Sequence, residues 1–226
     1  MPIDDFDVNK KISTTDSWRV FRILSEFVEG FEKMVELGPS VSVFGSARMQ
    51  SGPYHEIAKQ LGEEIVKRGF GVITGGGPGM MEAANFGAQM AKGRSCGLCV
   101  DLPHELEPNP YIDREFLLHF RYFFIRKVMF IRYSQGFVFL PGGYGSMDEL
   151  FEALTLVQTN KLKKFPIYLI GRDYWKGLHQ WLEEVVKASG AISAGDLAYM
   201  QITDDPIEVA EGIEHYYRQH YEQYHF

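Results

Sequence analysis

Short apolar runs alternate with amphipathic segments along most of the chain. The runs are bounded by turn residues and are typical of buried strands, whereas the amphipathic segments repeat apolar positions every three or four residues, as helices do. Strands are predicted at residues 41–44, 71–74, 96–101, 116–120, 138–140 and 167–170 and near Met200, and helices at residues 54–68, 80–91, 122–133, 147–160 and 174–188 and after Pro206. This alternation predicts an α/β fold: a doubly wound, Rossmann-like, mostly parallel sheet with helices on both faces.

An additional helix is predicted ahead of the first strand. Apolar residues recur every three or four positions from Trp18 to Val35, and Gly38 and Pro39 end the pattern. This helix is expected to lie against the main body or against a partner. Residues 1–16 are polar and mixed in charge, so we expect a flexible tail there and a single domain over residues 17–226.

Size and charge exclude several classes of protein. The 226 residues are 45% hydrophobic with a net charge of -7, which excludes a disordered chain and argues against nucleic acid as a partner. The most apolar segment, residues 116–140, carries four cations and is not expected to cross a membrane. With no leader pattern at the N-terminus, a cytoplasmic location is expected.

Cysteine and histidine usage favours neither redox nor metal chemistry. Cys96 and Cys99 have the spacing of a redox pair, but in a strand they point to opposite faces, so two buried thiols are expected. The seven histidines form no metal-ligand motif, and we predict no metal.

A glycine-rich stretch after the run at 138–140 carries the clearest chemical signal. It is expected to form a loop that leads into a helix, where free N–H groups and the helix dipole attract a phosphate. Glu149 would place a carboxylate beside this cradle. Alternatively, Ser146 and Glu149 form a capping box that only stabilises the helix start. The cradle residues are Gly142, Gly143, Tyr144, Gly145 and Ser146.

A second glycine-rich turn, after the run at 71–74, has the same design. Gly76, Gly77 and Gly79 precede a helix that carries Glu82 in its first turn. Met80 stands where a dinucleotide fingerprint needs its third glycine, so NAD is not expected. Because the carboxyl ends of parallel strands share one edge, both glycine turns are expected to line one site.

Three cations are further candidates for anion binding. Arg48 follows Ser46 in a small-residue turn after the first strand, which could equally be an ordinary surface loop. Arg126 and Lys127 lie side by side in an apolar helix, where they either meet an anion or extend to solvent. The proline-punctuated loop at 102–110 is a candidate rim of the site.

These motifs resemble the Lonely Guy (LOG) family of phosphoribohydrolases, often labelled as possible lysine decarboxylases. The family pattern PGGxGTxxE appears as residues 141–149, with serine at Ser146 in place of threonine, and the upstream arginine-lysine pair appears as Arg126 and Lys127. The resemblance covers about residues 41–206, and the first glycine loop and the N-terminal helix are similar to a longer bacterial branch.

The resemblance implies cleavage of the N-glycosidic bond of a nucleoside 5'-monophosphate, without a cofactor, by a homodimer or larger assembly with its sites near the subunit interface. It implies that Glu149 and Arg126 are the catalytic residues. A carboxylate beside C1' agrees with this reading, since it stabilises positive charge on the ribose and activates water. The family pattern also places a substrate-contacting threonine near Thr155, which points away from its own cradle and is therefore expected to reach the partner's site.

Two other functions compete with the hydrolase. A nucleotide- or molybdenum-cofactor-binding module of the same fold would keep the cradle without needing the Arg126–Glu149 pair. A lysine decarboxylase would need pyridoxal phosphate on a lysine, for which Lys127 is the only obvious candidate. Retention of both Arg126 and Glu149 favours the hydrolase.

Overall fold

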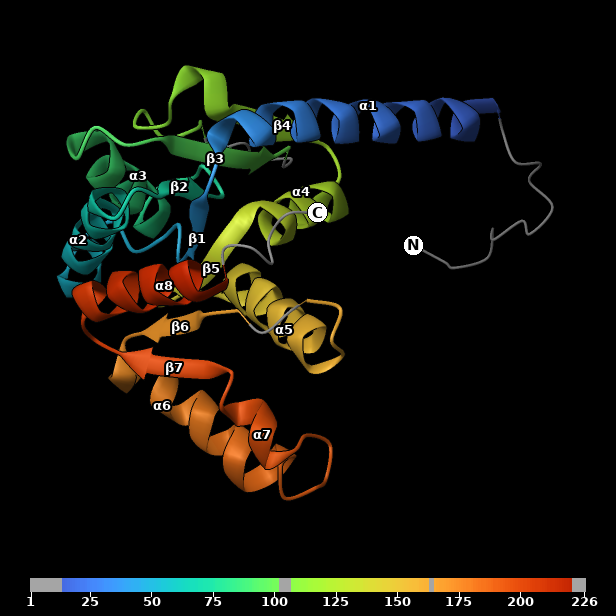
Figure 1. Ribbon diagram of the computed structural model, residues 1–226. Helices are drawn as coiled ribbons and strands as arrows, with labels where there is room; N and C mark the ends of the chain where they lie inside the picture. The colour runs from blue at the N-terminus through green and yellow to red at the C-terminus, as the bar shows by residue number, and fades with distance from the viewer. Residues whose placement is uncertain (1–13, 102–106, 163–164, 221–226) are drawn as a thin grey trace, which may run out of the picture.

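The computed structural model contains seven parallel strands in one sheet, ordered β4-β3-β2-β1-β5-β6-β7 (Figure 1). It describes residues 14–101, 107–162 and 165–220. The strands are β1 (Ser40–Phe44), β2 (Gly71–Thr74), β3 (Ser95–Val100), β4 (Leu117–Phe120), β5 (Ser134–Phe139), β6 (Ile167–Ile170) and β7 (Met200–Thr203). The predicted α/β, Rossmann-like sheet is therefore confirmed.

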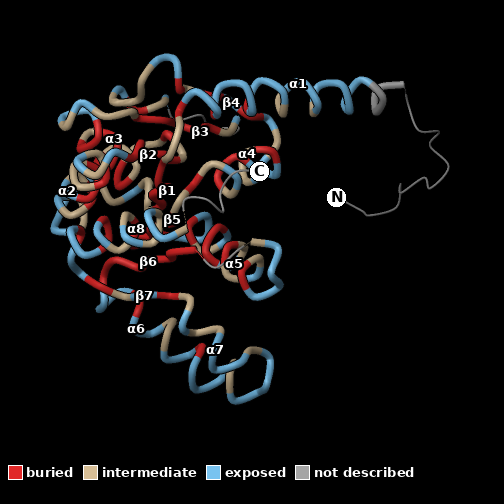
Figure 2. The backbone as a smooth tube through the Cα atoms, in the orientation of Figure 1, coloured by how far each residue is buried: buried red, intermediate tan, exposed pale blue. Residues whose placement is uncertain are grey.

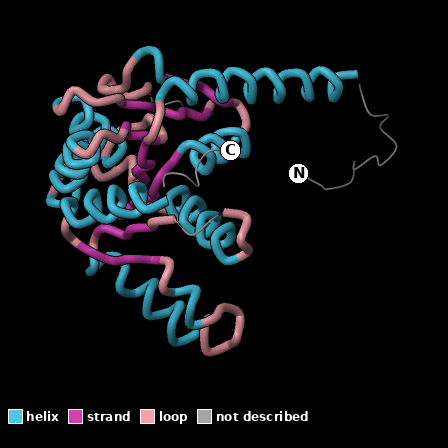
Figure 3. Tube along the Cα trace, viewed as in Figure 1, coloured by secondary structure: helices cyan, strands magenta, loops and turns pink. Residues whose placement is uncertain are grey.

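Helices cover both faces of this sheet (Figure 3). They are α1 (Thr14–Leu37), α2 (Pro53–Lys67), α3 (Met80–Met90), α4 (Phe123–Tyr133), α5 (Tyr144–Gln158), α6 (Arg172–Trp181), α7 (Ala194–Leu197) and α8 (Pro206–His220). A 3₁₀ turn, Arg114–Phe116, precedes β4, and a π-helical turn, Leu182–Val186, extends α6. Residues of α1, α4, α5 and α6 form one apolar core, and residues of α2, α3 and α8 form the other.

The strand order sets the position of a ligand site. From β1 the chain proceeds to β2, β3 and β4 on one side, and then returns to place β5 and the later strands on the other side of β1. In open parallel sheets, ligands bind outside the carboxyl ends of the strands at such a reversal. The loops after β1 and β5 are therefore the expected walls of a site.

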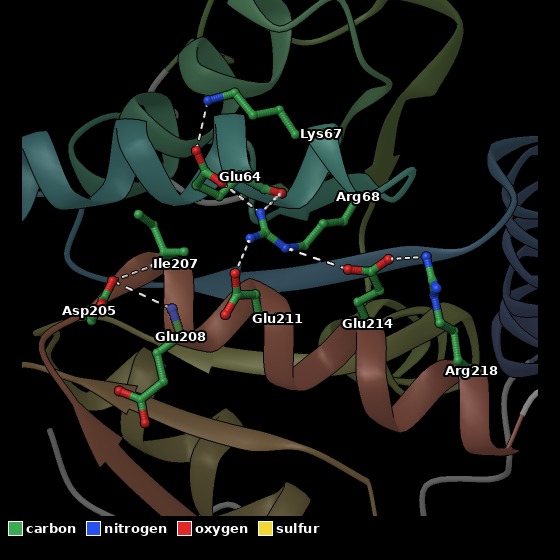
Figure 4. Close-up of polar contacts among 9 residues, drawn as sticks. All are labelled: Glu64, Lys67, Arg68, Asp205, Ile207, Glu208, Glu211, Glu214 and Arg218. Carbon is green, nitrogen blue, oxygen red and sulfur yellow. Dashed lines mark hydrogen bonds and ion pairs between the residues drawn. The ribbon is translucent and has the colours of Figure 1, made fainter.

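A cluster of charged residues fixes α8 to α2 on one side of the sheet (Figure 4). The guanidinium of Arg68, just after α2, donates to Glu64 Oε2 at 2.6 Å and to Glu211 Oε1 at 3.1 Å. Its Nε lies 3.7 Å from Glu214 Oε2. Asp205 accepts a 2.8 Å hydrogen bond from the N–H of Ile207 and so caps α8. None of these residues belongs to the loops after β1 and β5, so the contacts stabilise the packing of α8 on α2.

Several helix boundaries differ from the sequence prediction. Helix α1 begins at Thr14, so residues 14–16 are helical, whereas the rest of the predicted tail lies outside the described residues. Helix α5 begins at Tyr144, three residues before the predicted start, which shortens the glycine loop. The short helix α7 was not predicted. Its four residues are too few to show a helical period.

Candidate active site

A cavity of about 610 Å³ lies at the carboxyl edge of the sheet, where β1 and β5 are neighbours. This volume suits a small-molecule ligand. Nine predicted site residues line it: Ser46, Arg48, Arg126, Gly142, Gly143, Tyr144, Gly145, Ser146 and Glu149. The turn after β1, the loop after β5 and helix α4 thus contribute to one site.

The loop after β5 presents its backbone to this cavity. Gly143 is the N-cap of α5, with no side chain capping the helix. Among the described residues, the N–H groups from Gly142 to Ser146 donate no hydrogen bond. An atom added at the Cβ position of Gly143 or Gly145 would meet nothing within 4 Å. These unpaired donors at a helix N-terminus form an anion-binding arrangement.

The capping-box alternative for Ser146 and Glu149 is wrong. Ser146 lies inside the first turn of α5, because Gly143 occupies the N-cap position. Glu149 lies in the second turn of α5, and it is buried at the floor of the cavity rather than turned back to the helix start. The glutamate is therefore free for another role.

Arg126 and Glu149 face each other from α4 and α5. Arg126 Nη2 lies 3.8 Å from Glu149 Oε1, close enough to attract but too far for a direct hydrogen bond. The Arg126 guanidinium is sandwiched by the rings of Phe123 and Phe130, whose centroids lie 5.1 and 5.8 Å from its Cζ. Its buried Nε has no hydrogen-bond partner in the described part of the chain. The pair therefore retains unused hydrogen-bonding capacity.

Burial changes the ionisation of both members of this pair. It raises the pKa of Glu149 to about 7, although the charges of Lys127 and Arg126 oppose the rise. Burial also lowers the pKa of Arg126, which the Glu149 carboxylate opposes, and an arginine stays charged in any case. A glutamate that titrates near neutral pH beside a fixed cation is suited to acid–base chemistry.

Lys127 forms ion pairs between two helices. Its Nζ lies 2.8 Å from Asp148 Oδ2 and 2.8 Å from Glu152 Oε2, both on α5. It does not line the cavity. The two contacts join α4 to α5 and thereby hold Arg126 opposite Glu149.

The glycine turn after β2 lies mostly behind the cavity wall. Gly75 lines the cavity, but Gly76, Gly77, Gly79 and Glu82 do not. The side chain of Asn109 donates to the carbonyls of Gly76 and Gly77 at 3.2 and 3.1 Å. Part of the expected rim loop thus supports this turn, and residues 102–106 of that loop lie outside the described residues.

The turn after β1 connects the two glycine loops. The Ser46 N–H donates to the Pro141 carbonyl at 3.0 Å, and the Ser46 carbonyl accepts from Met80 N–H at 3.1 Å. The Ser46 hydroxyl accepts from the Arg48 N–H within its own turn. The exposed Arg48 side chain makes no ion pair with any described residue, so its charge is available at the rim.

Some lining residues carried no signal in the sequence. Tyr174, at the start of α6, donates its hydroxyl to the Gly142 carbonyl and orients the loop after β5. Only the sheet order, which puts β6 beside β5, brings it there. Phe130 lies one helical turn after Arg126, a spacing that could have indicated it. Phe44, Met81 and Met147 also line the cavity without having been predicted, whereas Gly45, Ala47 and Gly75 lie in the turns after β1 and β2 that were expected to form it.

Thr155 does not line the cavity. It is exposed, and its hydroxyl donates to the Phe151 carbonyl at 2.7 Å within α5.

The buried thiols expected at Cys96 and Cys99 are confirmed. Burial raises the pKa of Cys99 to about 11, so this thiol is protonated at neutral pH. The described residues contain no cluster of His, Cys, Asp or Glu able to hold a metal ion, and no described helix is long and apolar enough to span a membrane.

The sequence model of the family described as "Possible lysine decarboxylase" matches residues 81–213, more than half of the chain. This chain belongs to that family, the LOG family. The match includes α4, the loop after β5 and α5, and therefore both Arg126 and Glu149.

Curated relatives of this LOG-family chain include plant proteins. It is 30% identical over 132 residues to the cytokinin riboside 5'-monophosphate phosphoribohydrolase LOG of Oryza sativa subsp. japonica, covering 57% of this chain and 53% of that protein. It is 30% identical over 181 residues to the probable phosphoribohydrolase LOGL1 of the same plant, covering 79% of each. A third relative from this plant, the probable phosphoribohydrolase LOGL5, is 32% identical over 153 residues. The chain spans 53% of the length of LOG and 60% of the length of LOGL5.

Solved structures share the fold of this LOG-family chain. The molybdenum cofactor binding protein of Rippkaea orientalis has a TM-score of 0.57 at 21% identity, covering 78% of this chain and 94% of that one. The molybdenum cofactor carrier protein of Chlamydomonas reinhardtii has a TM-score of 0.55 at 19% identity, covering 80% and 99%. At these identities the likeness concerns the fold alone.

Proposed function

We propose that this chain hydrolyses the N-glycosidic bond of a nucleoside 5'-monophosphate, AMP or an N6-substituted AMP, to free base and ribose 5-phosphate. The observation that carries the proposal is the buried Arg126–Glu149 pair, 3.8 Å apart, beside an open helix N-terminus. The named activity of the curated relatives, cleavage of cytokinin riboside 5'-monophosphates, supports the same reaction class.

The substrate phosphate would bind at the start of α5. The unpaired N–H groups from Gly142 to Ser146 supply donors, the helix dipole adds a partial positive charge, and Arg48 adds a full charge at the rim. A nucleoside without phosphate forgoes all of these contacts. Discrimination between nucleotide and nucleoside therefore follows from this loop.

The reaction would take place between the phosphate site and Glu149. As the C1'–N bond breaks, its electron pair leaves with the base, which takes up a proton, and positive charge develops on the ribose. The Glu149 carboxylate stabilises this charge and accepts a proton from the water whose oxygen bonds to C1'. This proton returns through solvent and balances the one that the base takes up. Arg126 is placed to hold ribose or phosphate oxygens with the donors that its own subunit leaves unused.

The direct test is incubation of the purified chain with AMP, with N6-isopentenyl-AMP and with adenosine, followed by chromatography for free base. We expect base from one or both nucleotides and none from adenosine. Equal rates on AMP and adenosine would contradict the phosphate site. Tight nucleotide binding with no base released would support a non-catalytic binding module instead. Pyridoxal phosphate chemistry has no support, since Lys127 is held in ion pairs outside the cavity.

We also propose a homodimer or larger homo-oligomer with sites near the subunit interface. The helices that carry Arg126 and Glu149 expose apolar side chains at Phe123, Phe124 and Phe151. Thr155, exposed on α5, would then contribute to the partner's site. Mixing inactive Glu149→Gln subunits with inactive Thr155→Trp subunits should restore some activity, because one site in a mixed dimer carries neither change. Mixtures that regain nothing after demonstrated subunit exchange would contradict the shared site.

A further inference from the structure

Helix α1 has two separate apolar stripes, of which the body of the protein uses one. The inner stripe lies on α4 and on the 3₁₀ turn before β4, and its last members are fully buried. It consists of Ile23, Phe27, Gly30, Met34 and Leu37. This stripe explains how α1 is attached to the domain but leaves the rest of its apolar surface without a role.

The outer stripe is largely exposed, and its Phe31, whose ring contacts Phe27, Arg132 and Tyr133, touches the body of the protein. Its spacings alternate between three and four residues, the a and d pattern of a two-helix coiled coil. It consists of Phe21 (64% exposed), Leu24 (53%), Val28 (56%), Phe31 (36%) and Val35 (69%). Fourteen residues at 1.5 Å per residue give a seam about 21 Å long. A continuous apolar seam of this length, exposed to water, is typical of a surface that another helix covers.

Charges along α1 are unevenly distributed. From Trp18 to Ser25 the charged residues are Arg19 and Arg22, whereas from Glu26 to Leu37 four glutamates accompany one lysine. Two α1 helices in parallel would therefore place their acidic halves together. In an antiparallel pair, the basic half of each helix lies beside the acidic half of the other, which is the favourable arrangement.

The position of α1 leaves room for such a neighbour. Its first half projects past the rest of the domain (Figure 1), and this projecting half is largely exposed (Figure 2). A helix that overhangs its own domain can overlap with a second overhanging helix before the two domains collide. The charge pattern selects another α1 as that second helix.

We propose that α1 pairs in antiparallel orientation with α1 of a second copy of this chain through the outer stripe. The pair is two-fold symmetric, with Val28 next to the axis and Phe21 opposite the partner's Val35. Arg22 then lies near the partner's Glu36. This interface is separate from the catalytic residues, and its existence does not depend on the reaction proposed above.

Cysteine cross-linking tests both the pairing and its direction. Val28→Cys, Phe21→Cys and Val35→Cys are made in the full chain and oxidised with diamide, and the unchanged chain, whose two cysteines are buried, serves as control. Val28→Cys alone should form a covalent dimer. Phe21→Cys or Val35→Cys alone should not, because each lies about 21 Å from its own copy, but their mixture should cross-link after subunit exchange.

A second pair of variants shows that the seam itself causes the cross-link. Adding Leu24→Glu to Val28→Cys should remove most of the covalent dimer, whereas adding Lys33→Glu, on another exposed face, should not. Circular dichroism checks that both remain folded. Cross-linking of all three single cysteine variants on their own would indicate a parallel pair and overturn the proposal, as would the absence of cross-linking at Val28→Cys.

Discussion

The two glycine loops, residues 75–79 after β2 and residues 141–145 after β5, have similar sequences but differ in what their backbone contacts. In the first, the Gly76 N–H donates to Thr74 Oγ1 at 3.0 Å, and Asn109 binds the Gly76 and Gly77 carbonyls. In the second, the N–H groups donate to no described residue, and the Tyr144 side chain is 93% exposed.

The glycines of the two loops are therefore needed for different reasons. Gly79 has a φ of 70°, and a Cβ there would lie 2.5 Å from the Ser46 carbonyl oxygen. Gly145 lies inside α5 with open space around its Cβ position. The first loop needs glycine for folding and close packing. In the second, Gly142 also packs closely, against the Ser146 side chain, whereas Gly143 and Gly145 keep the backbone accessible to a ligand. Glycine content alone does not identify a phosphate site.

The largest difference is expected between the two glutamates that follow these loops. Glu149→Gln should lower turnover about 100-fold or more, because a carboxylate that stabilises charge and activates water is lost. Glu82→Gln, the matched change after the first loop, should alter turnover less than about twofold, since Glu82 does not line the cavity. Steady-state kinetics on AMP measure both, and comparable losses would remove the distinction between the loops.

Arg126→Ala should have the next largest effect. Loss of the guanidinium removes a ligand contact and leaves Lys127 as the nearby cation of Glu149, so binding should weaken and turnover should fall by about tenfold or more. Because the guanidinium also opposes the raised pKa of Glu149, the pKa of the carboxyl should rise further. Kinetics combined with nucleotide titration test this, and unchanged values would show that Arg126 takes no part.

Replacing one glycine of each loop by alanine distinguishes an effect on stability from an effect on substrate binding. Gly79→Ala should lower the free energy of unfolding by about 1 to 3 kcal/mol, because alanine is strained at this φ and meets the Ser46 carbonyl. Gly145→Ala should leave stability unchanged or raise it by about 0.5 kcal/mol, yet raise KM by adding a methyl group to the cavity wall. Denaturant unfolding and kinetics measure the two effects. The reverse assignment of effects would refute the comparison.

The contribution of Glu149 to stability should depend on pH. Since folding raises the pKa of Glu149 from 4.5 to about 7, the folded state favours the protonated carboxyl, and its stability falls as pH rises from 4.5 through 7. Replacement by glutamine removes this penalty, which is about 3 kcal/mol above pH 7 at most. Glu149→Gln should therefore be more stable than the unchanged chain at pH 8, and this advantage should shrink below pH 5. A less stable variant at pH 8 would favour a structural role.

The local spacing of apolar residues and glycines was enough to predict the sheet, most helices and the cavity wall after β5. The position of residues in the first glycine loop could not be predicted, because closure of that loop depends on Asn109, which is 33 and 32 positions from its hydrogen-bond partners Gly76 and Gly77. Likewise, Lys127 and Arg126 are adjacent in sequence, but only the packing of α4 on α5 decides which one faces the cavity. Long-range contacts of this kind leave no local signal.

The most direct test of the central claim is the rate of ribose 5-phosphate release from AMP between pH 5 and pH 9. If the ionised carboxylate of Glu149, on the helix that follows the second glycine loop, is catalytic, turnover should rise with pH and level off with an apparent pKa of about 7. The residual activity of Glu149→Gln should lack this transition. A profile that is flat across this range, or a transition that persists in Glu149→Gln, would contradict the assignment.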